Sequence, residues 1–197
     1  MKESMNAIRS FIAIELPISI QEQLDRVIAQ LKESVTGGVR WVPASNIHLT
    51  LKFLGDVSPA NMEILMKLLQ AEVSQVHAFS ISIAELGAFP SSRRPRVLWI
   101  GINAPPQLKA LARLVENETR KLGYAAEDRP FSPHLTLGRV SQSASHLQVR
   151  QVADTLAALK VGQLGRADVS EVVLFKSVLT PRGAEYTPLL KIPLLPQ

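Results

Sequence analysis

The sequence contains no cysteine, and this absence excludes several classes of protein. Without a thiol, the chain can form no disulfide framework, no thiolate metal site and no cysteine nucleophile. No apolar run approaches the roughly 18 residues that a membrane-spanning helix needs. Glu15 and Pro17 interrupt the apolar stretch near the start, and no small-residue cleavage site follows, so we expect no signal peptide. Together these absences favour a cytoplasmic protein that does not enter a membrane.

Groups of closely spaced metal ligands are missing as well. The chain has four histidines, and none of them belongs to an HExxH motif or to a tight cluster of histidine and carboxylate side chains. A histidine-based metal hydrolase is therefore disfavoured, and we expect neither a metal ion nor another cofactor.

The composition that remains is that of a folded globular protein. The 197 residues are 46% hydrophobic and 20% charged, which is enough for one large domain or two small lobes with a real core. The net charge of +5 favours an anionic partner such as nucleic acid or a phosphate ester, although many basic proteins bind neither. The sequence carries no information about oligomeric state, and a monomer is our default expectation.

Apolar periodicity predicts a β-α-β-α-β unit in the first half of the chain. Ser19 followed by Glu22 resembles a capping box that opens the first helix. We expect a turn at Gly55-Asp56, and Ser58 before a proline is a good start for the second helix. The expected elements are strands over 9–16, 47–54 and 77–86 and helices over 19–35 and 59–73.

The second half repeats the same plan. Its expected elements are strands over 96–102, 133–140 and 169–179 and helices over 105–122 and 145–159. A shift of 86 positions, the separation of His48 and His134, lays strand on strand and helix on helix, which indicates an internal duplication. The halves, about 9–86 and 96–179, are separated only by the short basic segment 90–96, and a strand over 184–195 closes the chain. We therefore predict one α+β domain of two pseudo-two-fold-related β-α-β-α-β lobes, whose largely antiparallel sheets face a central cleft.

The tetrapeptide His-Leu-Thr-Leu marks equivalent strands in the two halves, starting at His48 and at His134. Residues two apart in a strand point to the same side, so His48 shares a face with Thr50 and Lys52. His134 shares a face with Thr136 in the same way. A lone His-x-Thr would indicate surface strand residues, but two at matching positions of a duplication indicate a site.

Two imidazoles on opposite walls of one cleft are suited to acid–base catalysis near neutral pH. Phosphodiester cleavage needs this arrangement, because the attacking and leaving oxygens lie in line on opposite sides of phosphorus. Thr50 and Thr136 could donate hydrogen bonds to the non-bridging oxygens, and Lys52 could add positive charge on the same wall.

At this point the sequence resembles the two-histidine phosphoesterases, and among them the RNA 2′,3′-cyclic phosphodiesterases, also called 2′-5′ RNA ligases. The matching segments are Arg9-Ser-Phe-Ile-Ala13, Trp41-Val-Pro, Asn46-Ile-His-Leu-Thr-Leu-Lys-Phe-Leu-Gly55, Pro95-Arg-Val-Leu-Trp99, Arg129-Pro-Phe-Ser-Pro-His-Leu-Thr-Leu-Gly-Arg139 and Gly183-Ala-Glu-Tyr186. The resemblance implies a bilobal fold and an RNA or nucleotide substrate with a 2′,3′-cyclic phosphate end, which is hydrolysed to a 2′-phosphate. It also implies reversible ligation of 2′-5′ linkages as a second activity to be tested.

The resemblance also assigns roles to particular residues. It makes His48 the proton donor, His134 the proton acceptor, and Thr50 and Thr136 phosphate ligands. Arg139 matches a family arginine that contacts phosphate, but it follows His134 by five positions, an offset that a regular strand would send to the other face. A β-bulge or the end of the strand must redirect it.

Two aromatic residues in the matching segments are further candidates for substrate binding. Phe11 and Phe131 could stack on a base, and core packing is an equally good interpretation of both. His77 and His146 have no threonine two positions later, so we expect neither to be catalytic. The alternative to an enzyme is an RNA or nucleotide binding module of the same fold without significant catalysis.

Overall fold

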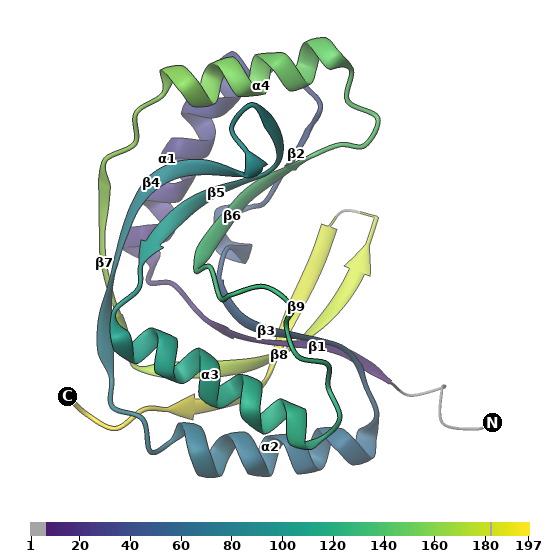
Figure 1. The fold of residues 1–197 in the computed structure, drawn as a ribbon, viewed down its shortest axis with the longest axis vertical. Helices are drawn as coiled ribbons and strands as arrows, with labels where there is room; N and C mark the ends of the chain where they lie inside the picture. The colour runs from purple at the N-terminus through teal and green to yellow at the C-terminus, as the bar shows by residue number, and fades with distance from the viewer. Residues whose placement is uncertain (1–6, 182) are drawn as a thin grey trace.

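The computed structural model describes residues 7–181 and 183–197, so the first six residues of the segment considered for a signal peptide lie outside it. Two sheets dominate the fold, and their strands pair antiparallel (Figure 1). The four-stranded sheet has the order β3 (Leu49–Val57), β1 (Ile8–Ile14), β8 (Glu171–Thr180) and β9 (Gly183–Pro193). The five-stranded sheet has the order β2 (Val39–Trp41), β6 (His134–Val140), β5 (Arg94–Asn103), β4 (Phe79–Ser91) and β7 (Gln163–Val169).

A pair of helices covers one face of each sheet. The helices are α1 (Ile18–Ser34), α2 (Pro59–Val73), α3 (Pro106–Lys121) and α4 (His146–Ala158), with a short 3-10 turn, η2 (Ala44–Asn46). α1 and α4 lie together against the five-stranded sheet, and α2 and α3 lie together against the four-stranded sheet (Figure 1). Each sheet with its helix pair forms one lobe, which confirms the predicted fold class.

The two halves of the sequence exchange elements between these lobes. β4 comes from the first half but pairs with β5 and β7, and β8 comes from the second half but pairs with β1 and β9. α1 and α3 are exchanged in the same sense, since α1 lies against β7 and α3 against β3. The duplication therefore does not give one lobe per half, because each lobe is built from both.

Segment 90–96, the expected boundary between the halves, is part of the β4–β5 hairpin. Ser91 pairs with Arg94 across a turn within the five-stranded sheet. Its polar and basic residues are therefore those of an exposed hairpin tip. The last predicted strand corresponds to β9 at the edge of the other sheet.

Two local signals at helix and strand ends were wrong. α1 begins at Ile18 after Pro17 without a side-chain cap, so Ser19 and Glu22 are not a capping box. The fixed φ of Pro17, −63°, already suits the position before a helix. Gly55-Asp56 is not a turn, because β3 continues to Val57; Gly55 takes a φ of +68° at an irregularity in the pairing with β1. The predicted cap of α2 is confirmed, since Ser58 Oγ accepts a hydrogen bond from the Asn61 N–H.

The buried apolar side chains form one large cluster that extends through both lobes. A second, smaller cluster lies on the face of the four-stranded sheet that its helices leave open; it comprises Phe11, Ala13, Val173 and Phe175, with Tyr186 packed against them. Within residues 7–181 and 183–197, no helix is long and apolar enough to cross a membrane.

Candidate active site

The two His-x-Thr motifs lie on strands of different sheets that approach each other. His48 directly precedes β3 of the four-stranded sheet, and His134 is the first residue of β6 in the five-stranded sheet. β3 and β6 come close in space although 86 positions separate the two histidines. Both imidazoles are partly exposed, as are Thr50 and Thr136.

Each imidazole is held by the backbone two residues before it. His48 Nδ1 lies 2.9 Å from the Asn46 carbonyl oxygen, and His134 Nδ1 lies 2.7 Å from the Ser132 carbonyl oxygen. A carbonyl oxygen only accepts, so Nδ1 must carry a proton and donate it in both rings. Nε2 is thus the nitrogen left to exchange a proton, as a base when the ring is neutral and as an acid when it is charged.

Aromatic rings contact both histidines. Phe11 stacks on His48 with centroids 4.6 Å apart, and the edge contact of Tyr186 with His48 has a centroid distance of 5.2 Å. Phe89 meets His134 edge-on at 5.0 Å. Burial lowers the pKa of His48 to about 4, although the hydrogen bond to Asn46 and the charge of Glu15 act in the opposite direction. The fold therefore favours the neutral imidazole at this position.

The threonine hydroxyls are free to bind a ligand. Thr50 pairs with Ala13 on β1, and Thr136 pairs with Trp99 on β5, so the backbone of each is fixed by its sheet. Among the side-chain hydrogen bonds of the described residues, none involves the hydroxyl of Thr50 or of Thr136. Both can donate to an oxygen that enters from outside.

A β-bulge after each motif changes which side chains share the histidine face. β3 has one extra residue at Leu51, because Thr50 pairs with Ala13 while Lys52 pairs with Ile12. β6 has the equivalent extra residue at Leu137. In a bulged strand the alternation shifts by one, so the residue five positions after each histidine joins the histidine face.

The bulge in β6 confirms the redirection that Arg139 requires. Arg139 is exposed, and its positive charge acts on Tyr186. Tyr186 belongs to the four-stranded sheet and packs on His48, so the Arg139 guanidinium points from the five-stranded sheet towards the residues around His48. Burial raises the pKa of the Tyr186 hydroxyl, while the charges of Arg139 and Arg9 lower it. Arg9 is therefore a second cation near Tyr186.

The prediction for Lys52 is wrong. The bulge at Leu51 turns Lys52 to the helix-covered face, where only 3% of it is exposed. Its Nζ forms an ion pair with Glu116 of α3 at 2.9 Å and donates a hydrogen bond to the Ala125 carbonyl at 2.6 Å. Lys52 is thus unable to meet a substrate beside His48.

The prediction that Phe11 stacks on a base is also wrong. Phe11 is 2% exposed, with His48 stacked at 4.6 Å and Phe175 stacked at 5.1 Å, so its faces are already occupied. Phe131 is half-buried and packs against the main core, in a loop just before His134. No ring contact within the described chain decides between its two interpretations.

Phe53 is a candidate substrate-binding residue that the alternation pattern of the sequence missed. Strict alternation from His48 would place Phe53 on the face that the helices cover, but the bulge at Leu51 leaves it 58% exposed with its ring 6.0 Å from that of Phe11. Phe53 and Arg139 hold equivalent positions, five residues after their histidines. The Arg139 offset that required a bulge in β6 was the signal that could have identified Phe53 in β3.

The other two histidines lie apart from these motifs. His77 Nδ1 contacts the Pro196 carbonyl at 2.7 Å, and exposed His146 is the first residue of α4. In the described part of the chain, no group of three or more histidine, aspartate or glutamate side chains is arranged to hold a metal ion.

Each of the two antiparallel sheets contributes one strand with a His-x-Thr motif, and these two strands approach each other. This arrangement defines the class of two-histidine phosphoesterases. Within that class the chain belongs to the family of LigT like phosphoesterases, whose model matches it twice, over residues 14–99 and 100–186. The two matches meet between Trp99 and Ile100, in agreement with a duplication.

Relatives and solved structures agree with this family over nearly the whole chain. The RNA 2′,3′-cyclic phosphodiesterase of Methanothermobacter thermautotrophicus is 34% identical over 91% of this chain and 95% of its own. That of Escherichia coli K12 is 32% identical over 92% of this chain and 93% of its own. The crystal structure of E. coli LigT complexed with 3′-AMP superposes with a TM-score of 0.76 and 29% identity, covering 96% of this chain and 99% of the other.

Proposed function

We propose that the protein hydrolyses the terminal 2′,3′-cyclic phosphate of RNA to a 2′-phosphate. The observation that carries the proposal is the matched pair of imidazoles, each with Nδ1 fixed by a backbone carbonyl so that Nε2 is the nitrogen that can exchange a proton. Each histidine is followed two positions later by a threonine whose hydroxyl makes no hydrogen bond within residues 7–181 and 183–197. This arrangement provides two proton-transfer groups and two hydrogen-bond donors for one phosphate.

In the proposed reaction, His134 acts as the base and His48 as the acid. Nε2 of neutral His134 takes a proton from water as the water oxygen bonds to phosphorus. The bond from phosphorus to the 3′ oxygen breaks, and protonated His48 gives its proton to that oxygen. Thr50, Thr136 and Arg139 bind the non-bridging oxygens, where negative charge is held. The products are a 2′-phosphate and a free 3′-hydroxyl.

The lowered pKa of His48 has a place in this scheme. In the free protein, burial keeps the ring neutral at neutral pH, since its pKa is about 4. An anionic phosphate bound beside it favours the charged form and so loads the donor only when substrate is present.

The names of the relatives support this substrate class. Proteins named RNA 2′,3′-cyclic phosphodiesterase match over most of the chain, and LigT has been crystallised with 3′-AMP and with phosphate. If a 5′-hydroxyl of RNA replaced water as the nucleophile, the same groups would form a 2′-5′ linkage. The proposal includes a monomeric, cytoplasmic enzyme, which gel filtration and cell fractionation would test.

The decisive experiment incubates the purified protein with a nucleoside 2′,3′-cyclic phosphate and identifies the product by phosphorus NMR. We expect a 2′-phosphate, a bell-shaped pH profile and no loss of rate on adding a chelator. His48→Ala and His134→Ala should each lower kcat by about a hundredfold or more, because each removes one proton transfer. His77→Ala is the matched control and should retain full activity.

Binding of the cyclic nucleotide without any new phosphomonoester would favour the binding module instead. Full activity in either the His48 or the His134 variant would refute the assignment of that histidine.

A further inference from the structure

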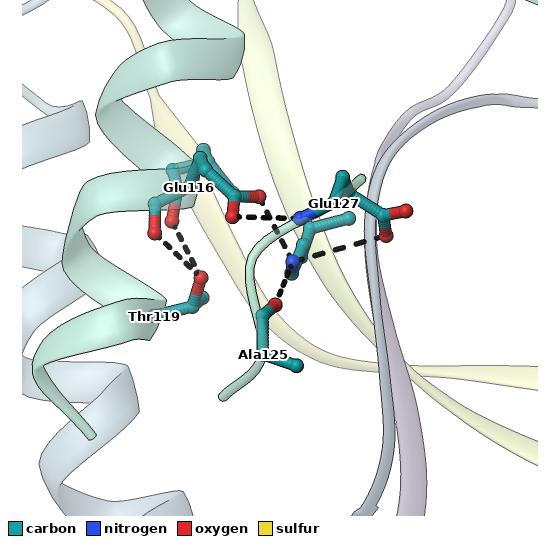
Figure 2. A network of polar contacts seen from close by, with 6 residues as sticks. Glu116, Thr119, Ala125 and Glu127 are labelled. Carbon is teal, nitrogen blue, oxygen red and sulfur yellow. Dashed lines mark hydrogen bonds and ion pairs between the residues drawn. The ribbon is translucent and has the colours of Figure 1, made fainter. Parts of the chain in front are cut away.

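The buried Lys52 belongs to a polar network between β3 and α3, on the helix-covered face of the four-stranded sheet. Figure 2 shows Glu116, Ala125 and Glu127 of this network. The network joins three parts of the chain: the strand that follows His48, the helix α3, and the segment 122–133 that leads from α3 to His134. It contains no residue of the proposed chemistry.

Glu116 is shared between two partners in this network. One carboxylate oxygen forms the ion pair with Lys52 Nζ at 2.9 Å, and the other accepts a hydrogen bond from the Glu127 backbone N–H at 3.2 Å. Lys52 also donates to the Ala125 carbonyl at 2.6 Å, and the Glu127 carboxylate lies 3.8 Å from its Nζ. The ammonium and the Glu116 carboxylate thus hold the backbone of the segment at two points (Figure 2).

These two points matter because segment 122–133 has no regular structure of its own. Its first residues are tied to the end of α3, where Tyr124 N–H donates to the Thr119 carbonyl. In the described part of the chain, the side-chain hydrogen bonds that hold residues 125–127 come from Lys52 and Glu116. Near the far end of the segment lies Ser132, whose carbonyl fixes the His134 ring.

The network is not a remnant of the duplication. The residue equivalent to Lys52 in the second half is Gly138, where a side chain would collide with Val39 and Trp41. The link therefore runs in one direction only: from β3, the strand that follows His48, to segment 122–133, which precedes His134. Gly138, which has no side chain, cannot make the equivalent link from the His134 strand.

We propose that Lys52 is a positioning residue, which fixes the segment before His134 to the strand after His48 and so sets the place of the proton acceptor relative to the proton donor. Lys52 acts on the Ala125 carbonyl directly and on the Glu127 N–H through Glu116, and from there through the segment to the Ser132 carbonyl; it does not touch substrate. This proposal rests on the proposed function for its effect on turnover, but not for its effect on the structure of the segment.

The test compares Lys52→Met with Lys121→Met. Methionine keeps the length of the side chain and removes the ammonium, which leaves Glu116 and the Ala125 carbonyl without their donor. Lys121 is the matched control, because it pairs with Glu118 on the same helix and is 58% exposed. Glu116→Gln is a second variant; its amide oxygen can still accept from the Glu127 N–H, while its amide nitrogen cannot accept from Lys52.

Three measurements apply to each variant: hydrogen exchange of the amides of 122–133, NMR of the His134 ring, and kinetics on a nucleoside 2′,3′-cyclic phosphate. For Lys52→Met we expect faster exchange in 122–133, displaced or broadened His134 resonances, and kcat lowered by about tenfold with a smaller change in KM, since phosphate contacts on β3 and β6 remain. Glu116→Gln should show the same changes at lower amplitude, and Lys121→Met none of them.

The proposal is overturned if 122–133 loosens while kcat stays at the level of Lys121→Met, because a merely structural role would give that result. It is also overturned if exchange and the His134 resonances are unchanged. If Lys52→Met does not fold, Glu116→Gln decides by the same criteria. If the wild-type protein makes no phosphomonoester, the proposed function fails, and the exchange and NMR measurements still decide whether Lys52 positions His134.

Discussion

The imidazole of His48 occupies a place where burial opposes the charge that catalysis requires. Phe11 covers one face of the ring and Tyr186 meets it edge-on, and the resulting loss of hydration is what lowers its pKa to about 4. The same shift makes the stability of the fold depend on pH. Because the ring binds a proton less readily in the folded state than in the unfolded state, acid conditions favour unfolding.

We predict that His48→Gln weakens the pH dependence of stability between about pH 6.5 and 4. In the wild type, the contribution of His48 is intact above the unfolded pKa of 6.5 and is lost as the pH falls towards 4. At pH 5 the loss should be about 2 kcal/mol. Urea unfolding at pH 7 and pH 5 measures it, with exposed His146→Gln as the control. An equal change in unfolding free energy between pH 7 and pH 5 for the wild type and His48→Gln would contradict the prediction.

For individual residues, the sequence predicted which ones carry the proposed chemistry, but it assigned the residues after each motif to the wrong face of the strand. His48, Thr50, His134 and Thr136 were identifiable because a duplicated motif needs no knowledge of packing. Lys52 was misplaced because strict alternation continues through Leu51, whereas the strand has an extra residue there. A bulge depends on the register with a neighbouring strand, and no single strand sequence reports that register.

Among the elements, β6 is closely packed against its neighbour β2 next to the site. A Cβ added at Gly138 would lie 2.9 Å from Val39 Cγ1, 3.0 Å from the Trp41 ring and 3.2 Å from the Arg40 carbonyl oxygen. These atoms belong to β2, the edge strand that pairs with β6 beside the bulge. Glycine at this position lets β2 approach the bulge that presents Arg139.

We predict that Gly138→Ala destabilises the protein by about 1–3 kcal/mol, because β2 must move away from β6. Gly162→Ala is the matched control, since a Cβ there meets nothing within 4 Å, and its effect should stay within about 0.5 kcal/mol. Thermal or urea unfolding measures both. Equal stabilities of the two variants would contradict the prediction, because β2 would then accommodate the added methyl group at no cost in free energy.

Element order was readable from the sequence, but the pairing of the elements was not. Periodicity located the strands and helices because burial acts on each element separately. It could not show that β4 and β8 cross to the other sheet, since each would bury the same apolar face in either position. The exchange follows from long-range pairing, which is set by the whole chain.

For the whole molecule, the exchange predicts that neither half folds alone. A cut between Ser92 and Arg93, at the tip of the β4–β5 hairpin, would leave β4 without β5 and β1 without β8. We expect each fragment alone to lack a cooperative unfolding transition, and the mixed fragments to regain one together with activity. Circular dichroism and the cyclic nucleotide assay measure this. An intact chain with two extra residues at the same turn is the control, and a cooperative transition in either fragment alone would disprove the prediction.

The exchange of strands and helices also limits how the lobes can move. A protein that closes by a hinge usually has few chain crossings between its moving parts, and those crossings take up the change in backbone angles. Here the backbone passes between the lobes repeatedly, through α1, β4, α3 and β8, so no short segment can serve as the pivot. We therefore expect the spacing between the His48 and His134 strands to be set during folding, before a substrate binds.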